Sequence, residues 1–546
     1  MKIFAHARYA CLALAVICTI AKAQAADLES QQLNSAQAIV DKGIELERER
    51  KWIQAIQLYE AGERKFPIDG ELRRRLLISR LHYDVVRRLT DSSIGDLVRN
   101  VTEAEALELY SEVLARLEMS YVDKVDMTEI VRGGTAYLEV ALTEPNFLAS
   151  HLSGQSRERI EQFRTSIHRQ TLARTVSNRF DARNIVSQAA KSAERSVNLR
   201  ASTTIMQFVF GAVALLDPYS SFMSPAELNE VESQIEGNFV GLGIALQPHE
   251  VPLQILNVIP GGPALEAGVR AGDRILKIGS VVCAEVGAEK AADLLRGPEN
   301  SRVRLAMLRE DGSNYDCVVV RRRVEVPSVE DVKIVDPTAA VGYLKISSFQ
   351  KTTARELDDA LWNLQKQGMQ SLIIDLRGNP GGWLDASVSV ADRFLNNGGI
   401  VRTRGKNGIE NQNYRATSQN TWNMPLVLMI DDESASASEI LAGAIRDNHR
   451  GVLVGERSYG KGSVQGLFHT RSLGTGIRLT VSKFYSPSGM AISRRGVSPT
   501  VPINDVHFVA KPDYSAPEPV KDKMLHAAIM QARDSVASTP DAYARH

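Results

Sequence analysis

The sequence predicts a multidomain α+β protein with an N-terminal helical region, a β-rich middle and a C-terminal α/β core. Apolar residues recur at helical spacing through about the first 235 residues. From there to about residue 325, apolar and polar residues alternate in segments that are separated by glycine-rich turns. Beyond residue 325 the pattern predicts short strands separated by helices. We expect the domains to be residues 1–25, 26–98, 99–235, 236–325, 326–505 and 506–546.

The composition is that of a globular chain without a charge bias. The 546 residues include 65 basic and 65 acidic side chains, and 44% are hydrophobic. This balance points away from nucleic acid as a partner. The 10 histidines and 4 cysteines show no zinc-type ligand spacing, so we expect neither a metal nor a cofactor.

The first 25 residues have the pattern of a secretory signal peptide. Basic residues precede an apolar run from Ala10 to Ile20, and 23–25 offers a small-x-small cleavage site. A membrane anchor is the alternative, but the run is shorter than the ~20 residues that a span needs. Cys18 follows a bulky residue and is a poor match to a lipoprotein signal. We expect export to a bacterial periplasm or cell envelope, with no stable membrane span after signal removal.

The helical region begins with a predicted helix pair between about residues 35 and 68. Its signature residues are Gly43, Ala55, Tyr59, Gly62 and Pro67. Their spacing resembles one tetratricopeptide repeat. One repeat cannot bury its apolar face alone, so it must pack on the following helices or on a partner, with packing favoured over a site for an adaptor protein. Further along, the polar stretch from Leu152 to Arg200 predicts a long exposed helical insertion.

The β-rich segment contains glycine-rich runs at 237–244, 258–269 and 272–278, and it resembles a PDZ domain. The amides that can hold a free peptide carboxylate belong to Gly241, Leu242, Gly243 and Ile244. An exposed strand edge would pair with the peptide backbone. The alternative is a small β-rich packing domain. Cys283 and Cys317 lie here, either as a disulfide or as two buried free thiols.

The C-terminal core predicts stacked βαβ units. Strands at 340–347, 371–376, 425–431 and 451–455 alternate with helices near 353–368, 383–396 and 437–447. A later strand around Leu479 should help to cover the site. After Pro502 the periodicity is lost, so residues 506–546 are expected to be a mobile tail.

Ser436 stands where a predicted strand gives way to a helix. Unpaired amides at a helix start favour an alkoxide and then an oxyanion, which makes Ser436 a candidate nucleophile and the amide of Ala437 a candidate oxyanion donor. Without other residues, the same run is an ordinary helix N-terminus. Asp447 is expected about 16 Å away along the helix axis, which favours a structural role.

Lys461, between two glycines and 25 residues after Ser436, is the candidate general base. A lysine acts as a base only when its amine is largely neutral, which needs burial or a nearby positive charge. No acid lies between Arg457 and Phe468. Gln465 follows Lys461 by four residues, which is two side-chain periods of an extended stretch, so the two side chains should face the same way. Gln465 could then orient the lysine amine without favouring its protonated form.

A glycine-rich corner follows the strand at 371–376. It contains Gly381 and Gly382, and such a strand-to-helix corner can aim backbone amides at a developing negative charge. The alternative is a tight turn with no ligand. The sequence does not choose between the two glycines as the second oxyanion donor.

Together these segments resemble the C-terminal processing peptidases, also called tail-specific proteases. The resemblance covers about residues 100 to 505 and rests on 375–382, 434–439, Asp447, 455–456, 459–462, Gln465 and 485–489. It implies a crotonase-like (ClpP/crotonase) core in which Ser436 is the nucleophile and Lys461 the general base. By the same likeness Gln465 orients the lysine, and the oxyanion hole is formed by the amides of Ala437 and of Gly381 or Gly382.

The implied function is a serine endopeptidase that cleaves proteins at or from C-terminal tails recruited by the PDZ domain. Gating of the active site by that domain is a hypothesis here. Two other functions stay open at this point: a non-catalytic PDZ scaffold that binds peptides, and a serine-lysine amidase that acts on a non-protein envelope amide. The complete set of serine, lysine and glutamine disfavours the scaffold, and the PDZ domain disfavours the amidase.

Overall fold

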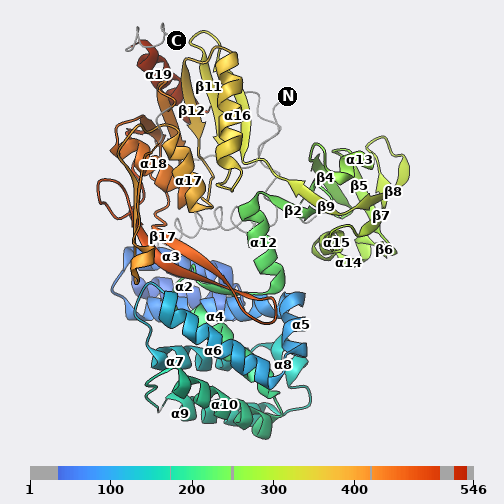
Figure 1. Cartoon of the computed structure of the whole chain (residues 1–546). Coiled ribbons are helices and arrows are strands. Elements are labelled where there is room, and N and C mark those ends of the chain that lie inside the picture. The colour runs from blue at the N-terminus through green and yellow to red at the C-terminus, as the bar shows by residue number, and fades with distance from the viewer. Residues whose placement is uncertain (1–34, 173, 248–250, 418–420, 504–521, 538–546) are drawn as a thin grey trace.

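The computed structural model describes residues 35–172, 174–247, 251–417, 421–503 and 522–537. The expected signal peptide lies outside these residues. Figure 1 shows a helical body at the bottom, a layered α/β core above it and a small β-rich domain to the right of the core. This arrangement confirms the predicted multidomain α+β fold. In the part of the chain that is described, no helix is long and apolar enough to span a bilayer.

The N-terminal body is built from helices. They are α2 (Ala36–Arg48), α3 (Trp52–Lys65), α4 (Gly70–Thr90), α5 (Ser92–Asn100), α6 (Glu103–Ser120), α7 (Met127–Ala141), α8 (Pro145–His151), α9 (Arg157–Leu172), α10 (Arg179–Val197) and α11 (Ala201–Ala214). Polar caps set several starts; at α6, Thr102 and Glu105 form a reciprocal capping box. Helix α11 is apolar and buried along almost its whole length, so it forms the centre of this body.

The tetratricopeptide-like pair is formed by α2 and α3. Gly43 provides its close contact, because a Cβ there would fall 2.2 Å from the Tyr59 ring. The apolar face of the pair is covered by Leu72 and Leu76 of α4. The hairpin therefore packs on the next helix of its own chain, and the structure offers no support for a separate adaptor site there.

The stretch from Leu152 to Arg200 is not an exposed insertion, contrary to the sequence prediction. It forms α9 and α10, and Phe163, Ile167 and Val186 are buried in the main core of the helical body. Much of the buried face of α10 consists of alanine, whose small side chain lets helices approach closely. A face made of alanine is harder to recognise as apolar in the sequence than one made of larger residues.

The β-rich domain has a strand pair and a larger sheet. Its elements are β2 (Asn238–Gly241), β3 (Ile244–Leu246), β4 (Leu253–Val258), α13 (Pro263–Glu266), β5 (Arg274–Ile278), β6 (Val281–Val282), α14 (Cys283–Val286), α15 (Ala288–Leu295), β7 (Arg302–Leu308), β8 (Asn314–Val320) and β9 (Arg322–Glu325). The sheet order is β3-β4-β5-β7-β8, with β6 on β5, and β2 pairs with β9. Cys283 and Cys317 are free thiols rather than a disulfide, but only Cys283 is buried and Cys317 is half-buried.

The α/β core contains a six-stranded sheet in the order β10-β11-β12-β15-β16-β19. Its elements are β10 (Val329–Asp336), β11 (Val341–Ile346), α16 (Thr353–Lys366), β12 (Ser371–Asp375), α17 (Leu384–Asp392), β15 (Leu426–Ile430), α18 (Ala437–Asp447), β16 (Val452–Gly455) and β19 (Val501–Pro502). All neighbours are parallel except the edge pair β10 and β11. These strands and helices match the predicted βαβ order.

The two faces of this sheet are covered by different helices. Leu372 and Ile374 of β12 pack in the cluster that contains α16, α17 and α18. Ile373 between them faces the other way, toward Met524 and Ala528 of α19 (Lys523–Ala537). The expected mobile tail thus includes a helix that covers one face of the core sheet.

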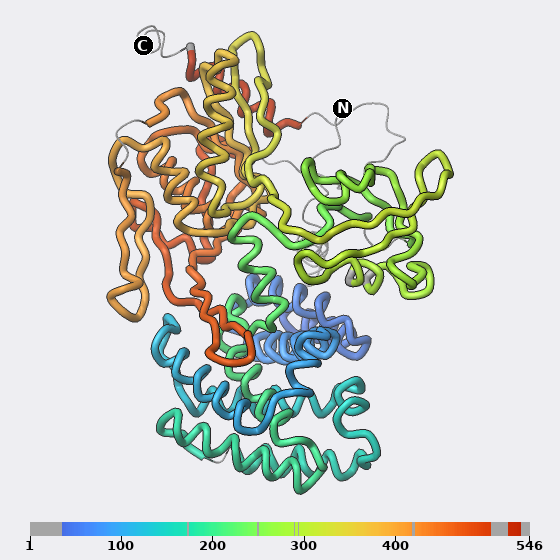
Figure 2. The backbone as a smooth tube through the Cα atoms, turned by 45° about the vertical axis from the view of Figure 1, so that its right-hand side comes forward, coloured from blue at the N-terminus to red at the C-terminus, as the bar shows by residue number. Residues whose placement is uncertain are grey.

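A second sheet joins the core to the helical body. It has the order β1 (Ser221–Met223), β18 (Gly476–Tyr485), β13 (Gly399–Gly405), β14 (Asn413–Arg415), and β17 (Ser463–His469) also pairs with β18. The short helix η1 (Gly408–Glu410) lies between β13 and β14, and α12 (Pro225–Glu236) leads from β1 to the β-rich domain. Figure 2 shows the orange-red β17–β18 hairpin reaching the helices. Ile477 and Leu479 are buried in the helical core cluster, so β18 packs on the helical body.

Candidate active site

Ser436 occupies the turn between β15 and α18 in a strained backbone conformation. Its φ is 55° and its ψ is −110°, which a residue with a side chain rarely adopts. The turn is held by Asp431, whose carboxylate accepts the amides of Gly378 and Ser434. In the described chain no hydrogen-bond acceptor is found for the amide of Ala437, the first residue of α18, which fits an oxyanion donor.

The glycine-rich corner is fastened to the serine turn by the buried Asn379. Its backbone carbonyl accepts from the amide of Ala435 at 3.0 Å and from the hydroxyl of Ser438 at 3.0 Å. Its side-chain oxygen accepts the amide of Gly381 at 2.8 Å. The amide of Gly381 is thereby engaged, whereas the hydrogen bonds of the described chain include none from the amide of Gly382. This difference favours Gly382 as the second oxyanion donor.

Gly381 lies directly against the nucleophile segment. A Cβ on Gly381 would fall 2.8 Å from the Ser436 Cβ, 2.8 Å from the Ala437 amide nitrogen and 2.7 Å from the Ala435 carbonyl oxygen. The φ of Gly381 is +102°, which also favours glycine. The space beside the serine therefore exists because residue 381 has no side chain.

Glu439 of α18 is a structural residue of the site to which the sequence analysis gave no role. Its buried carboxylate accepts the amides of Ser436 at 2.8 Å, Gly460 at 2.7 Å and Lys461 at 2.9 Å, and the hydroxyl of Ser458 at 2.6 Å. Burial raises its pKa, while these hydrogen bonds oppose the rise. One side chain thus fixes the backbones of both catalytic candidates. The Ser-x-x-Glu spacing of a capping box was the available sequence signal.

Lys461 lies in the turn before β17, and its amine lies in a partly apolar environment. Its Nζ is 5.0 Å from the centre of the Tyr219 ring. Burial and the positive charge of Arg478 lower the pKa of Lys461 to about 8, against the opposing effect of Glu439 and Asp217. No carboxylate forms an ion pair with it within the described ranges.

Gln465 is placed differently from the sequence expectation. The pairing of β17 (Ser463–His469) with β18 has a register irregularity between Val464 and Gln465, so the regular side-chain alternation that the prediction used is interrupted before Gln465. The amide nitrogen of Gln465 donates to Ser463 Oγ at 2.9 Å and reaches Thr480 Oγ1 at 3.5 Å, and among the described hydrogen bonds none joins Gln465 to the Lys461 amine. The site described here therefore has its serine and lysine segments joined through Glu439, with Gln465 bonded elsewhere.

Asp447 has the structural role that its position on α18 predicts. It accepts from the amide and hydroxyl of Ser488 at 3.0 and 2.7 Å, and it pairs with Arg446 at 2.8 Å. These contacts hold the turn after β18 against the end of the helix.

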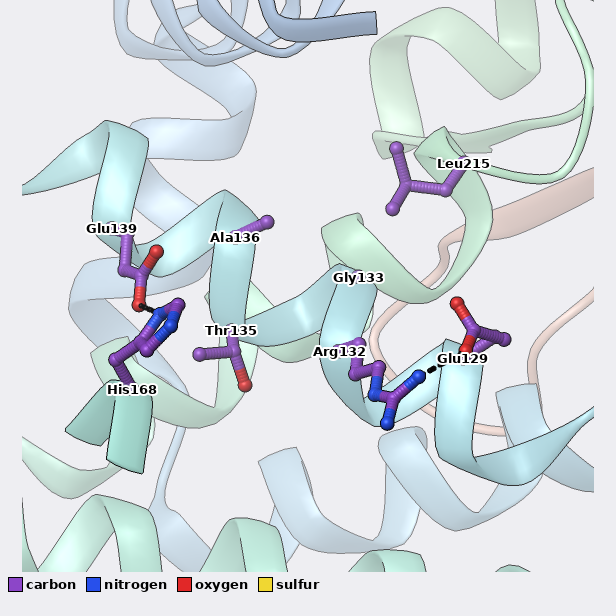
Figure 3. A pocket seen from close by; sticks show the side chains of 8 residues that line it. All are labelled: Glu129, Arg132, Gly133, Thr135, Ala136, Glu139, His168 and Leu215. Carbon is purple, nitrogen blue, oxygen red and sulfur yellow. Dashed lines mark hydrogen bonds and ion pairs between the residues drawn. The ribbon is translucent and has the colours of Figure 1, made fainter. Parts of the chain in front are cut away.

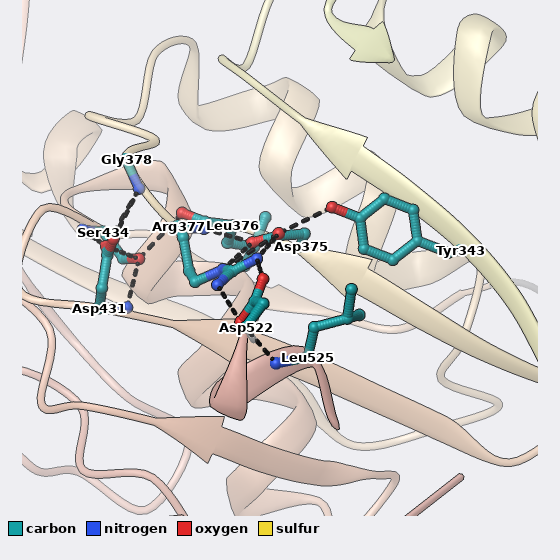
Figure 4. A network of polar contacts seen from close by, with 9 residues as sticks. All are labelled: Tyr343, Asp375, Leu376, Arg377, Gly378, Asp431, Ser434, Asp522 and Leu525. Atoms are coloured by element: carbon teal, nitrogen blue, oxygen red, sulfur yellow. Dashed lines mark hydrogen bonds and ion pairs between the residues drawn. The ribbon is translucent and has the colours of Figure 1, made fainter. Parts of the chain in front are cut away.

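A second polar network lies behind the glycine-rich corner (Figure 4). Arg377 pairs with the buried Asp375 at 2.7 Å and with Asp522 before α19 at 3.0 Å. The Tyr343 hydroxyl donates to Asp375 at 2.8 Å. The corner that carries the candidate oxyanion donor is thus tied to the C-terminal helix.

The candidate carboxylate-binding loop of the β-rich domain, residues 241–244, has open backbone amides. Gly241 ends β2 and Ile244 begins β3, with Gly243 at a φ of +76° between them. The carbonyls of Leu242 and Gly243 accept from Ala264 and Ile259, whereas their amides have no acceptor among the described hydrogen bonds. Strand β3 is at the edge of its sheet.

A pocket of about 230 Å³ opens in the helical body, away from these residues (Figure 3). Its charged groups already pair with each other, Arg132 with Glu129 and His168 with Glu139. It therefore offers no free charge for a ligand and is not part of the site.

Comparison with known proteins decides the family. Residues 340–503 match the model of peptidase family S41, and residues 254–309 match a PDZ domain. A carboxyl-terminal-processing protease of Picosynechococcus sp. is 36% identical over 53% of this chain and 70% of its own length. The chain belongs to the carboxyl-terminal processing proteases.

A second relative supports the same family. The carboxy-terminal processing protease CtpA of Bacillus subtilis is 31% identical over 62% of this chain and 72% of its own. A solved photosystem II D1 C-terminal processing protease aligns over 74% of this chain and 94% of its own, at 25% identity and a TM-score of 0.39. The β-rich segment of this carboxyl-terminal processing protease is a PDZ domain, and the protein is a serine-type peptidase whose substrates are proteins.

Proposed function

We propose that this protease cleaves its substrates with a dyad of Ser436 and Lys461. The observation that carries the proposal is the Glu439 carboxylate, which holds the backbone amides of both residues at 2.8 and 2.9 Å. The lowered pKa of Lys461, about 8, further supports an amine that can be neutral near physiological pH.

The proposed mechanism is acyl transfer. Lys461 removes the hydroxyl proton of Ser436, and the alkoxide attacks the peptide carbonyl. The oxyanion is stabilised by the amides of Ala437 and Gly382. The ammonium then protonates the leaving amine, and water releases the acyl-enzyme with the lysine again as base. Gln465 would orient the lysine through its amide oxygen, which can accept from the Lys461 amine while the amide nitrogen donates to Ser463.

We propose that the PDZ domain recruits the substrate through its C-terminal tail. The free amides of Leu242 and Gly243 can bind the terminal carboxylate, and the open edge of β3 can pair with the peptide backbone. Export to the bacterial envelope stays a prediction from the sequence, because the leader lies outside the described residues.

The dyad is tested with Ser436→Ala and Lys461→Ala. Both variants should lose proteolysis and labelling by a fluorophosphonate, yet still bind a tail peptide, because the PDZ domain is unchanged. Full activity of Lys461→Ala would refute the assigned base. For wild type, kcat/KM should rise with pH through about 8 as the amine becomes neutral.

Tail recruitment is tested with one substrate protein that carries either a free or an amidated C-terminus. The free form should be cleaved faster, through a lower KM. Equal rates for both forms would argue against carboxylate recognition while leaving the dyad intact.

A further inference from the structure

Arg478 lies outside the proposed dyad, but it shares a neighbour, Tyr219, with the proposed base Lys461. It projects from β18 opposite Leu467 of β17 and Ser221 of β1. Its Nε donates to the carbonyl of Tyr219 at 3.1 Å. The ring of the same tyrosine lies 5.0 Å from Lys461 Nζ. One residue therefore holds the guanidinium by its main chain and contacts the lysine amine by its side chain.

The loop that carries Tyr219 is rigidly attached to β18. Asp217 accepts the amides of Tyr219 and Ser220 at 2.8 and 3.1 Å, and it accepts the hydroxyl of Thr480 at 3.1 Å. Ser220 in turn accepts the amide of Thr480 at 3.1 Å. The loop belongs to the connection between the helical body and the PDZ domain, so the surroundings of the base come partly from outside the α/β core.

Neither cation is neutralised by a direct ion pair in the described part of the chain. The groups that face Lys461 are Arg478, Glu439 of α18, Asp217 and the uncharged ring of Tyr219. Arg478 also faces the ion pair of Arg87 and Glu227, which joins α4 to α12. Two partly buried cations therefore act on each other. Their repulsion disfavours the protonated form of Lys461, because the lysine loses its proton more easily than the arginine.

We propose that Arg478 is a positioning residue for catalysis, fixed by Tyr219 so that its guanidinium keeps the Lys461 amine in the neutral form that removes the Ser436 proton. A guanidinium stays charged at every working pH, so it supplies a constant positive field. This inference rests on the proposed role of Lys461 as the base.

The experiment measures kcat/KM from pH 6 to 10 for wild type, Arg478→Gln and Arg478→Lys, with the rate of fluorophosphonate labelling as a second readout. Removing the positive charge lets the lysine hold its proton to higher pH. The acidic limb of Arg478→Gln should move up by about one pH unit, which is about a tenfold loss at pH 7. Arg478→Lys carries a positive charge only while its own amine is protonated, so its acidic limb should lie between those of wild type and Arg478→Gln.

Lys483→Gln on the same strand is the matched control, because Lys483 is exposed and pairs with Asp123. Its limb should stay at the wild-type pH. If the thermal melting curve of Arg478→Gln shows that this variant is not folded, Arg478→Met is used as the neutral variant instead. An unshifted limb in a folded neutral variant, with Lys461→Ala inactive, would overturn the role of Arg478 and leave the dyad standing. Full activity of Lys461→Ala would instead remove the dyad itself.

Discussion

The carboxylate of Glu439 accepts the backbone amide of Lys461 at 2.9 Å, although the two residues lie on opposite sides of the strand β16 in the sequence. The same carboxylate accepts the amide of Ser436. The relative position of the proposed nucleophile and base is therefore set by a residue that need not touch the substrate. Precise positioning of this kind matters because a displacement of about 1 Å can cost on the order of 100-fold in rate.

Replacing Glu439 by glutamine should impair both stability and activity. The amide group of glutamine would turn a donor toward backbone amides that need an acceptor. We expect a loss of about 2 kcal/mol in the free energy of unfolding and a fall of about 10- to 100-fold in kcat/KM. Chemical denaturation and a peptide-cleavage assay measure the two effects.

Glu433→Gln is the control for that substitution. Glu433 precedes the same turn, but burial, Asp431 and Asp432 raise its pKa to about 7, so a neutral amide resembles its protonated form. Its kcat/KM at pH 7 should stay near wild type. Equal losses in both variants would show that the turn tolerates no change of charge and would remove the special role of Glu439.

Gly381→Ala should abolish proteolysis. The methyl group would fall 2.8 Å from the Ala437 amide nitrogen and from the Ser436 Cβ, at a φ of +102°. It would displace the serine turn and fill the space where the oxyanion forms, so we expect a loss of more than about 100-fold in kcat/KM.

Gly378→Ala separates backbone strain from this steric effect. Gly378 has a φ of +69°, but the nearest atom to its added Cβ is the flexible end of Glu433 at 3.3 Å. We expect a cost of about 1–2 kcal/mol in stability and most of the activity to remain. Activity in Gly381→Ala equal to that of Gly378→Ala would contradict the placement of the oxyanion site.

The sequence predicted the core well where periodicity and turn chemistry agree. The βαβ order and the candidate residues Ser436 and Lys461 follow from apolar strands that end at glycine- or serine-rich corners. Residues 152–200 were mispredicted, because the alanine-lined face of α10 carries little hydropathy. The neighbourhood of Lys461 could not be read from sequence, since Tyr219 and Arg478 reach it from two distant segments.

The C-terminal helix α19 gives a last prediction, because it is tied to the glycine-rich corner through Asp522. This side chain pairs with Arg377 and also accepts the amide of Leu525 at 2.9 Å, which caps the helix. Asp522→Ala removes both contacts and should cost about 2–3 kcal/mol. Asp522→Asn keeps the cap and loses only the charge, so its cost should be smaller, about 1 kcal/mol.

The measurement is the free energy of unfolding, followed by kcat/KM at matched fractions of folded protein. His526→Ala, on an exposed position of the same helix, should stay within about 0.5 kcal/mol of wild type. Because Arg377 keeps its pair with Asp375, the corner should retain its shape and folded Asp522→Ala should remain active. If Asp522→Ala were as stable as His526→Ala, α19 would not be held to the core through this contact, and its burial of Met524 and Ala528 would have to carry the packing alone.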